Sequence, residues 1–249
     1  MTTRRWIADE ATGNTAALTG DHAQHLARVL RAEIGQQFDI ATGTSVRRGV
    51  ITAINDDRVE FTLGEEQPIT PAPDLTLALA IFKFDRMEWA IEKCTELGVT
   101  RIVPIIARRT DTHLSTAAPK RRERWQRLAL QASEQSRRLA PPEIAAPTRL
   151  KDLGTAGALP VARRAPSPAE TPDAKIVLAE SENDLRLREA LTARPAALTL
   201  AIGPEGGWAP DELQWFHDNN WTAASLGDTI LRAETAAIVA TALALDALR

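Results

Sequence analysis

The spacing of apolar residues changes near residue 70. Before it, short runs rich in β-branched and aromatic residues are separated by Gly, Asn and Asp, which predicts a small β-rich unit. We expect its strands at Arg5–Ala8, Gln37–Ala41, Gly49–Ile54 and Val59–Leu63. One helix interrupts them, because residues 22–30 carry apolar side chains at helical spacing, behind a cap at Thr19 or Asp21.

A proline-rich stretch follows this unit. Pro68, Pro71 and Pro73 fall within six residues, which excludes both a helix and a central strand. The sequence therefore predicts two domains, at residues 1–70 and 75–249.

Strands and helices alternate in the second domain. Leu75–Ile81 is a continuous apolar run, typical of a strand covered on both faces. Further strands are expected at Val99–Ala107, Lys175–Ala179, Ala197–Ile202 and Ala223–Leu226, and helices at 85–97, 119–139, 185–191, from Pro210, and at 233–248. Repeated strand–helix units predict an α/β fold with a parallel sheet and helices on both faces.

The sequence also predicts where some helices end and which of their faces are buried. Asp85 and Glu88 predict a capping box for the helix that Gly98 ends. The basic helix is expected to turn Trp125, Leu128, Ala132 and Gln135 inward. The last helix is apolar nearly all round and should be buried in a core or an interface. Residues 153–174, rich in Ala, Pro and Gly, predict a long connection.

Two tight loops near the C-terminus are the best candidates for a site. Gly203–Gly207 follows one expected strand, and Leu226–Ala236 leads from another into the last helix. Ligands of parallel sheets bind at these carboxyl ends of strands. Neither loop matches a P-loop or a dinucleotide fingerprint. Glycines beside aliphatic side chains suit a flat heterocycle that is read by backbone groups.

Charge is unevenly distributed along the chain. The net charge is −3, yet residues 101–150 hold eleven Lys or Arg against four acids, a local net charge of +7. Ten of the eleven are Arg, whose planar fork suits phosphates and base edges. A solvated helix face is the alternative explanation of this stretch.

Other features limit the classes of function. No apolar run approaches the ~18 residues that span a bilayer, and Met1–Trp6 leads into no signal-like segment. Cys94 is the single cysteine, which excludes an internal disulfide and favours a buried apolar role. His22 and His25 have no third ligand nearby, so we expect no metal. These features together predict a cytoplasmic protein without a membrane partner.

Six segments, in order along the chain, resemble one known family. The two C-terminal loops look like the cofactor loops of SPOUT-class methyltransferases, and most closely those of the bacterial 16S ribosomal RNA uracil-N3 methyltransferases. The other segments that match this branch are Asp21–Arg31, Lys83–Trp89 with Lys93–Val99, Glu123–Trp125, and Glu134–Arg138 before Pro141-Pro142. Ala233 and Trp208 depart from it, standing where Thr and Phe are usual, and residues 154–174 carry no family signal.

The resemblance implies a fold, a reaction and partners. The fold would be a SPOUT-type α/β domain with a C-terminal trefoil knot at about residues 175–249, preceded by a PUA-like β-barrel that contacts RNA. The knot rests on the resemblance alone. The enzyme would be a homodimer that uses S-adenosyl-L-methionine to methylate N3 of a uridine in 16S rRNA of the small ribosomal subunit.

The resemblance also suggests site residues. Those expected to bind the cofactor are Leu178, Ile202, Gly203, Pro204, Glu205, Gly206, Gly207, Ser225, Leu226, Gly227, Ile230, Leu231, Thr235 and Ala236. Arg232 is the first candidate for stabilising the negative charge on O2 and O4 of the base. Glu205 or Glu234 would accept the N3 proton or orient Arg232, although Arg232 and Glu234 would also suit a simple ion pair. Arg28, Arg31, Arg137 and Arg138 are expected to position RNA backbone.

Three other interpretations stay open. A ribose 2′-O-methyltransferase would share the cofactor loops, but the Asn-x-Gly-x-x-x-Arg element expected of one is missing from the sequence. An RNA- or ribosome-binding adaptor would retain a vestigial pocket without catalysis. The missing phosphate motifs disfavour an unrelated nucleotide-binding enzyme.

Overall fold

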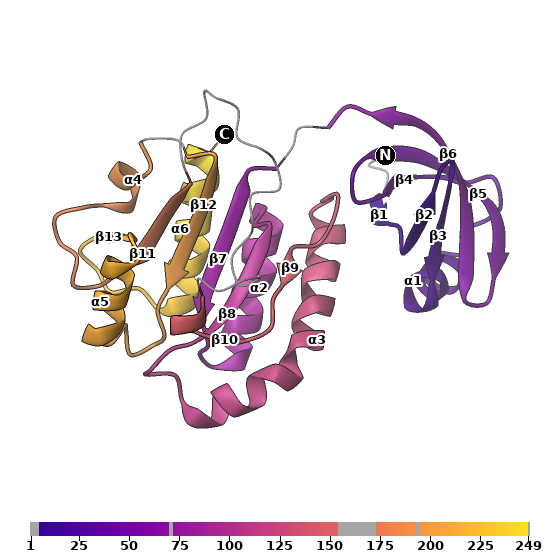
Figure 1. Ribbon diagram of the computed structural model, residues 1–249. Helices are drawn as coiled ribbons and strands as arrows, with labels where there is room; N and C mark the ends of the chain where they lie inside the picture. The colour runs from indigo at the N-terminus through magenta and orange to yellow at the C-terminus, as the bar shows by residue number, and fades with distance from the viewer. Residues whose placement is uncertain (1–4, 70–71, 154–172, 193–194, 249) are drawn as a thin grey trace. The chain divides into compact units, whose positions relative to one another are not determined.

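The computed structural model of the chain describes residues 5–69, 72–153, 173–192 and 195–248 (Figure 1). These residues form two compact units. The first takes the chain up to Pro71 together with Ser133–Pro141, and the second takes Ala72–Ala132 and the chain from Pro142 onward. The segment Ser133–Pro141 therefore packs with the first unit, although it lies far from that unit in sequence.

The first unit is a curled six-stranded sheet. Its strands follow the order β1 (Arg5–Ile7), β4 (Gln37–Ala41), β5 (Val46–Asn55), β6 (Arg58–Gln67), β3 (Thr15–Thr19) and β2 (Glu10–Thr12). The chain passes directly from one edge strand to the other, where Ala8 N–H donates to the Ala41 carbonyl (2.9 Å) and Asp9 N–H to the Ala17 carbonyl (3.0 Å). These bonds extend the β1–β4 and β2–β3 pairings into the two residues that join the edge strands.

One helix fills the open side of this sheet. Helix α1 (Gly20–Gln24) continues into a π-helical turn at His25–Val29, which confirms the helix expected there. Leu26 from this turn packs with Trp6 and Phe61 in the core of the unit. The four expected strands are confirmed, but β2 and β3 were not predicted. Their alanines give little strand signal, and their pairing is set by the neighbouring β6.

The second unit contains a parallel sheet, as the alternating pattern predicted. Its strands follow the order β10 (Thr148–Arg149), β8 (Arg101–Ile106), β7 (Asp74–Ala80), β12 (Ala197–Ile202), β11 (Ala174–Leu178) and β13 (Thr222–Ala224), and β9 (Glu143–Ile144) also pairs with β8. Every pair in this sheet is parallel. The carboxyl ends of β11, β12 and β13 consequently lie at one edge.

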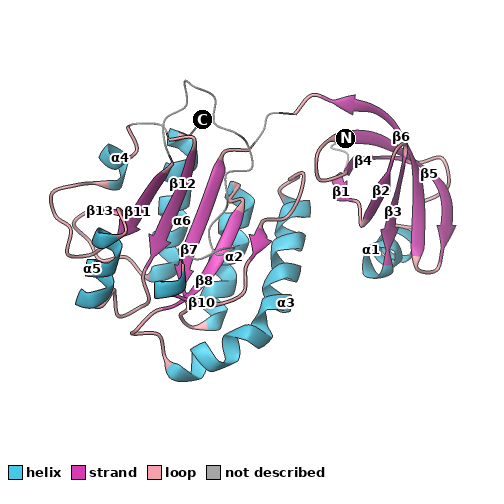
Figure 2. Cartoon of the chain, viewed as in Figure 1, coloured by secondary structure: helices cyan, strands magenta, loops and turns pink. Residues whose placement is uncertain are grey.

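Helices cover both faces of this sheet (Figure 2). On one face, Leu75, Leu77 and Leu79 of β7 pack with α2 (Phe84–Leu97), α6 (Ala233–Ala247) and α4 (Leu187–Ala190). On the other face, Ala78 and Ala80 pack with α5 (Pro210–Asp218) and with the 3₁₀ turn Leu150–Asp152. The alternation along β7 explains its continuous apolar run, since both of its faces are buried.

The last helix and Cys94 lie in this core. Helix α6 buries one side against α2, while Val239 and Leu243 are each 37% exposed. Cys94 is fully buried, and the Thr241 hydroxyl donates to its sulfur at 3.4 Å. Burial raises the pKa of the Cys94 thiol to about 12. The complete burial of Cys94 in the core confirms the expected apolar role.

Two details of the expected helices are wrong. Lys83, not Asp85, is the N-cap of α2, and Glu88 accepts a hydrogen bond from Arg124 (2.8 Å) instead of capping the helix. The basic helix α3 spans Thr112–Gln135 with Pro119 inside it. It begins earlier than expected because the Asp111 carboxylate accepts a hydrogen bond from the His113 N–H (2.7 Å).

The inner side of α3 is close to the expected one. Trp125 and Ala132 are buried and Leu128 is half-buried, but Gln135 is exposed. The expected connection at 153–174 falls mostly outside the described residues. No helix in the described ranges is both long and apolar enough to cross a bilayer.

Candidate active site

A pocket of about 640 Å³ lies in the second unit, at the carboxyl ends of β11, β12 and β13. Three segments form most of its wall, at residues 178–183, 202–208 and 224–233. The expected loop pair supplies two of these segments. The third follows β11, because the sheet places that strand between β12 and β13.

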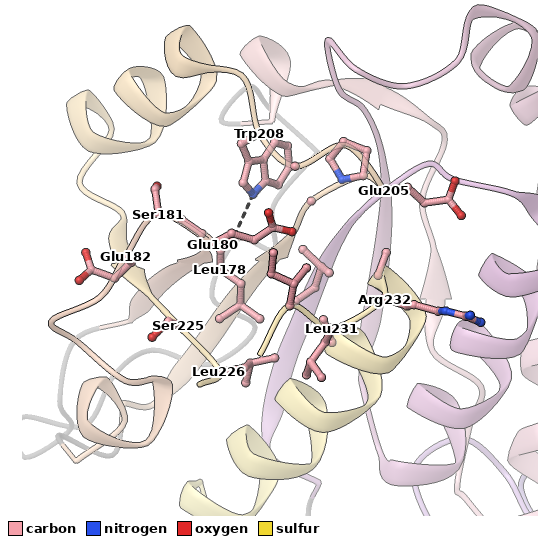
Figure 3. Close-up of a pocket in the computed structure, with 18 of the residues that line it drawn as sticks. Leu178, Glu180, Ser181, Glu182, Glu205, Trp208, Ser225, Leu226, Leu231 and Arg232 are labelled. Carbon is pink, nitrogen blue, oxygen red and sulfur yellow. Dashed lines mark hydrogen bonds between the residues drawn. The ribbon is translucent and has the colours of Figure 1, made fainter. Parts of the chain in front are cut away.

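The first loop is held against the end of β11. Gly207 N–H donates to the Pro204 carbonyl (2.8 Å), and Gly207 has φ +69°, which favours glycine. Trp208 Nε1 donates to the Leu178 carbonyl at 3.1 Å (Figure 3). A Cβ on Gly203 would lie 3.2 Å from that indole nitrogen. Glycine at 203 thus allows the Trp208 ring to tie two walls of the pocket together.

The second loop is held by the segment before α4. Ser225 N–H donates to the Leu185 carbonyl (2.9 Å), and Leu187 N–H donates to the Ser225 carbonyl (2.8 Å). Arg186, which lies between Leu185 and Leu187 in the chain, donates from Nη2 to Asp228 Oδ1 at 2.5 Å. Gly227 has φ +143°, and a Cβ there would lie 3.2 Å from Arg186 Nη1. Arg186 therefore lies across the glycine of this loop.

Cations from two other segments enter the same pocket. Arg109, after β8, donates to the Gly206 carbonyl at 2.6 Å. Arg86, in the first turn of α2, donates to Glu205 Oε1 at 2.7 Å, and its Nε lies 3.8 Å from Glu234 Oε1. Lys83 also lines the pocket and is exposed. Neither Arg86 nor Arg109 was singled out in the sequence.

Acidic side chains occupy the opposite side. Figure 3 shows Glu205 and Arg232 on one side of the pocket, and Ser181 and Glu182 on the other. Hydrogen bonds from the backbone N–H groups of Asp184 and Leu185 hold the pKa of Glu182 below its usual value. Arg232 and Glu205 thus lie on one side of the pocket, and Glu182, whose carboxylate is held by backbone N–H groups, lies on the other.

The pocket includes all but one of the residues expected to bind a cofactor. Those that line it are Leu178, Ile202, Gly203, Pro204, Glu205, Gly206, Gly207, Ser225, Leu226, Gly227, Ile230, Leu231 and Ala236. Thr235 is half-buried and does not line it.

The three residues expected to act in catalysis differ in their surroundings. Glu205 lines the pocket, paired with Arg86, whereas Glu234 is 4% exposed and lies outside the lining. Glu234 Oε2 has no hydrogen-bond partner among the described residues. Arg232 lines the pocket and is exposed, and its side chain makes no hydrogen bond or ion pair within the described part of the chain. Arg232 and Glu234 thus do not form the ion pair that their spacing suggested.

The four arginines expected to contact RNA all belong to the first unit. Arg28 is exposed, and its Nη2 lies 3.4 Å from Asp56 Oδ1. Arg31 and Arg137 have φ of +52° and +58°, and Arg31 is exposed. Arg138 is half-buried, and burial lowers its pKa to about 10. Arg138 is thus less accessible than Arg28 and Arg31.

The sequence positions of His22 and His25 raised the question of a metal. His22 Nδ1 lies 3.1 Å from Asp9 Oδ1. The residues that the structure describes contain no group of three or more side chains suited to hold a metal ion.

Family comparisons agree with this geometry. A family model described as an RNA methyltransferase domain matches residues 70–245, and one described as an RNA methyltransferase PUA domain matches residues 18–64. The chain belongs to this RNA methyltransferase family.

Individual members of the RNA methyltransferase family match along most of the chain. The ribosomal RNA small subunit methyltransferase E of a Synechocystis species is 34% identical, over 92% of this chain and 72% of the relative. The protein of the same name from Rickettsia conorii is 32% identical, over 93% and 90%.

Solved structures of this RNA methyltransferase family have the same fold. The Neisseria gonorrhoeae ribosomal RNA small subunit methyltransferase E, bound to S-adenosyl methionine, has a TM-score of 0.80 and 27% identity, over 97% of this chain and 96% of the other. A Legionella pneumophila protein with the same cofactor bound has a TM-score of 0.81 and 26% identity, over 99% and 98%. The first unit is thus PUA-like, and the second is the RNA methyltransferase domain.

Proposed function

We propose that this chain transfers a methyl group from S-adenosyl-L-methionine to N3 of a uridine in the 16S rRNA of the small ribosomal subunit. The observation that carries the proposal is the pocket with two glycine loops at the carboxyl ends of β11, β12 and β13. Relatives that share the fold across the chain bind this cofactor, and others are named for the small subunit rRNA.

The residues of the pocket fit this cofactor. Its volume of about 640 Å³ is in the usual range for a bound small molecule. Leu178, Leu226 and Leu231 offer apolar surface for the adenine, and the glycine loops expose backbone groups for its edge. The fixed charge of Glu182 and the carboxylate of Glu180 suit the cationic amino-acid part. When bound, the cofactor would supply a methyl group on a positively charged sulfur.

The chain's own residues would handle the charge on the uridine. N3 loses its proton as it attacks, and negative charge spreads to O2 and O4. We assign its stabilisation to Arg232, a pocket cation whose side chain makes no ion pair within the described residues. Glu205 Oε1 already accepts a hydrogen bond from Arg86. We therefore assign Glu205 the role of orienting Arg86, and the N3 proton of the uridine leaves to water.

We assign different roles to the two domains. Residues 1–70 would bind RNA and residues 75–249 would carry the reaction, with Arg28, Arg31, Arg137 and Arg138 positioning the RNA backbone. N3 lies on the Watson–Crick edge, so the target base must be unpaired or turned out of its stack.

We also propose a knot at about residues 175–249 and a homodimer in the cytoplasm. The knot is inferred from the resemblance to SPOUT-class methyltransferases. The partly exposed Val239 and Leu243 on α6 give an apolar surface for a second copy.

Two measurements test the proposal. Calorimetry should detect binding of S-adenosylmethionine, and absence of binding would favour an adaptor with a vestigial pocket. Labelled methyl groups should then pass from the cofactor to small ribosomal subunits that lack the modification. Comparison with free 16S rRNA would decide whether the assembled particle is the substrate.

A further inference from the structure

Arg86 lies between the carboxylates of Glu205 and Glu234. Its Nη1 donates to Glu205 Oε1 at 2.7 Å, and its Nε lies 3.8 Å from Glu234 Oε1. Glu234 lies in the first turn of α6, two residues after Arg232. Removing Arg86 would therefore leave two acidic side chains without their cation, beside an arginine that has no ion pair in the described residues.

The burial of these groups makes the balance of charge important. The Glu234 side chain is 5% exposed, and its Oε2 has no hydrogen-bond partner in the described ranges. A buried carboxylate strongly favours any cation that can approach it. The side chains of Arg86 and Glu205 are 32% and 38% exposed, so their pair adds little to stability. The Arg86–Glu205 pair would instead matter because it determines which cation the two carboxylates bind.

We propose that Arg86 is a positioning residue for methyl transfer, which pairs with Glu205 and Glu234 and thereby keeps the Arg232 guanidinium free for the substrate base. This inference rests on the proposed function of the pocket. Figure 3 shows Glu205 and Arg232 directed to the same side, which makes Arg232 a cation available to replace Arg86. An Arg232 paired with a carboxylate would stabilise the uridine anion less, because its charge would already be balanced.

The structure of the Arg86→Gln variant tests this directly, without any assay. We expect Arg232 to move to within about 4 Å of a carboxylate oxygen of Glu205 or Glu234, the distance of an ion pair. An Arg232 that keeps its wild-type position, away from both carboxylates, would overturn the proposal. This result does not depend on the substrate of the enzyme.

The rate of methyl transfer provides a second test of the role of Arg86. Single-turnover methylation of small subunits should be at least ~10-fold slower in Arg86→Gln, as expected when a charge-stabilising group is weakened. Adding Glu205→Gln to this variant should recover part of the loss, ~3-fold or more, because one competing carboxylate is gone. Arg86→Lys should retain more activity than Arg86→Gln, since it keeps the charge.

Two controls separate this role from a structural one. Lys93→Gln removes another ion-paired cation of α2 that does not line the pocket, and should leave the rate unchanged. If Arg86 merely anchored the loop, the Arg86→Gln/Glu205→Gln variant would be no faster than Arg86→Gln, which would contradict the proposal. If the wild type transfers no methyl group to RNA, the proposed function fails, and the position of Arg232 in the Arg86→Gln structure still decides the inference.

Discussion

Trp208 Nε1 donates a hydrogen bond of 3.1 Å to the Leu178 carbonyl, which joins the loop after β12 to the end of β11. Trp208 is 6% exposed, and its ring packs edge-to-face on Phe216, with centroids 4.9 Å apart. A single side chain thus fixes the spacing of two pocket walls. Phenylalanine at this position would have no donor for the Leu178 carbonyl.

Replacing Trp208 with Phe should weaken cofactor binding. The Leu178 carbonyl would lose its partner, at a cost of about 1–3 kcal/mol if no water replaces it, and the walls would lose their link. We expect a several-fold rise in the Kd for S-adenosylmethionine by calorimetry. Trp215→Phe is the matched control, since Trp215 also packs on Phe216 but does not line the pocket. Equal effects of both variants on Kd would refute the role of the hydrogen bond.

Replacing Gly207 with Ala should strain the first loop. Gly207 has φ +69°, where an L-residue costs about 1–2 kcal/mol. Both the melting temperature and the cofactor affinity should fall. Gly35→Ala provides the control, because Gly35 has φ +88° in the first unit, outside the pocket. That variant should lower the melting temperature while the Kd for the cofactor stays unchanged.

Replacing Arg232 with Ala should slow the chemical step far more than it weakens cofactor binding. Loss of a group that stabilises developing charge typically costs ~100-fold or more in kcat. We expect a reduction of this size in single-turnover methylation, with the Kd for S-adenosylmethionine changed less than ~3-fold. Arg188→Ala removes an exposed arginine of α4 that does not line the pocket, and should behave as wild type. Near wild-type rates in Arg232→Ala would exclude this assignment.

The arginines of the first unit should differ in their effect on RNA. Replacing the exposed Arg28 and Arg31 with Ala should weaken RNA binding. The slope of log Kd against log salt should fall by roughly one unit for each phosphate that the protein no longer neutralises. Arg138 is half-buried, so its replacement should lower the melting temperature in addition to weakening RNA binding. An unchanged salt slope in the Arg28→Ala/Arg31→Ala variant would place the RNA elsewhere.

The sequence predicted the pocket loops because their signals are local. Ala197–Ile202 is a buried strand, and the glycines after it occupy the turn. Buried apolar runs and helical spacing likewise located most strands and helices of the second unit. Local patterns suffice where one segment determines its own conformation.

The rest of the site depends on pairings between distant segments. Arg86 and Glu205 are 119 residues apart, and Arg109 and Gly206 are 97 apart. They meet because β7 pairs with both β8 and β12, an order that no local pattern encodes. Glu88 is a second example. Its spacing from Asp85 predicted a helix cap, but in the folded chain its carboxylate accepts a hydrogen bond from Arg124.

The most direct test of the account is the chemical position of the transferred methyl group. Small ribosomal subunits lacking the modification should be incubated with the protein and methyl-labelled S-adenosylmethionine, and the 16S rRNA then digested to nucleosides for mass spectrometry. The label should be recovered as N3-methyluridine. Label on a ribose or on another base, or RNA left unlabelled by a protein that binds the cofactor, would contradict the proposed function.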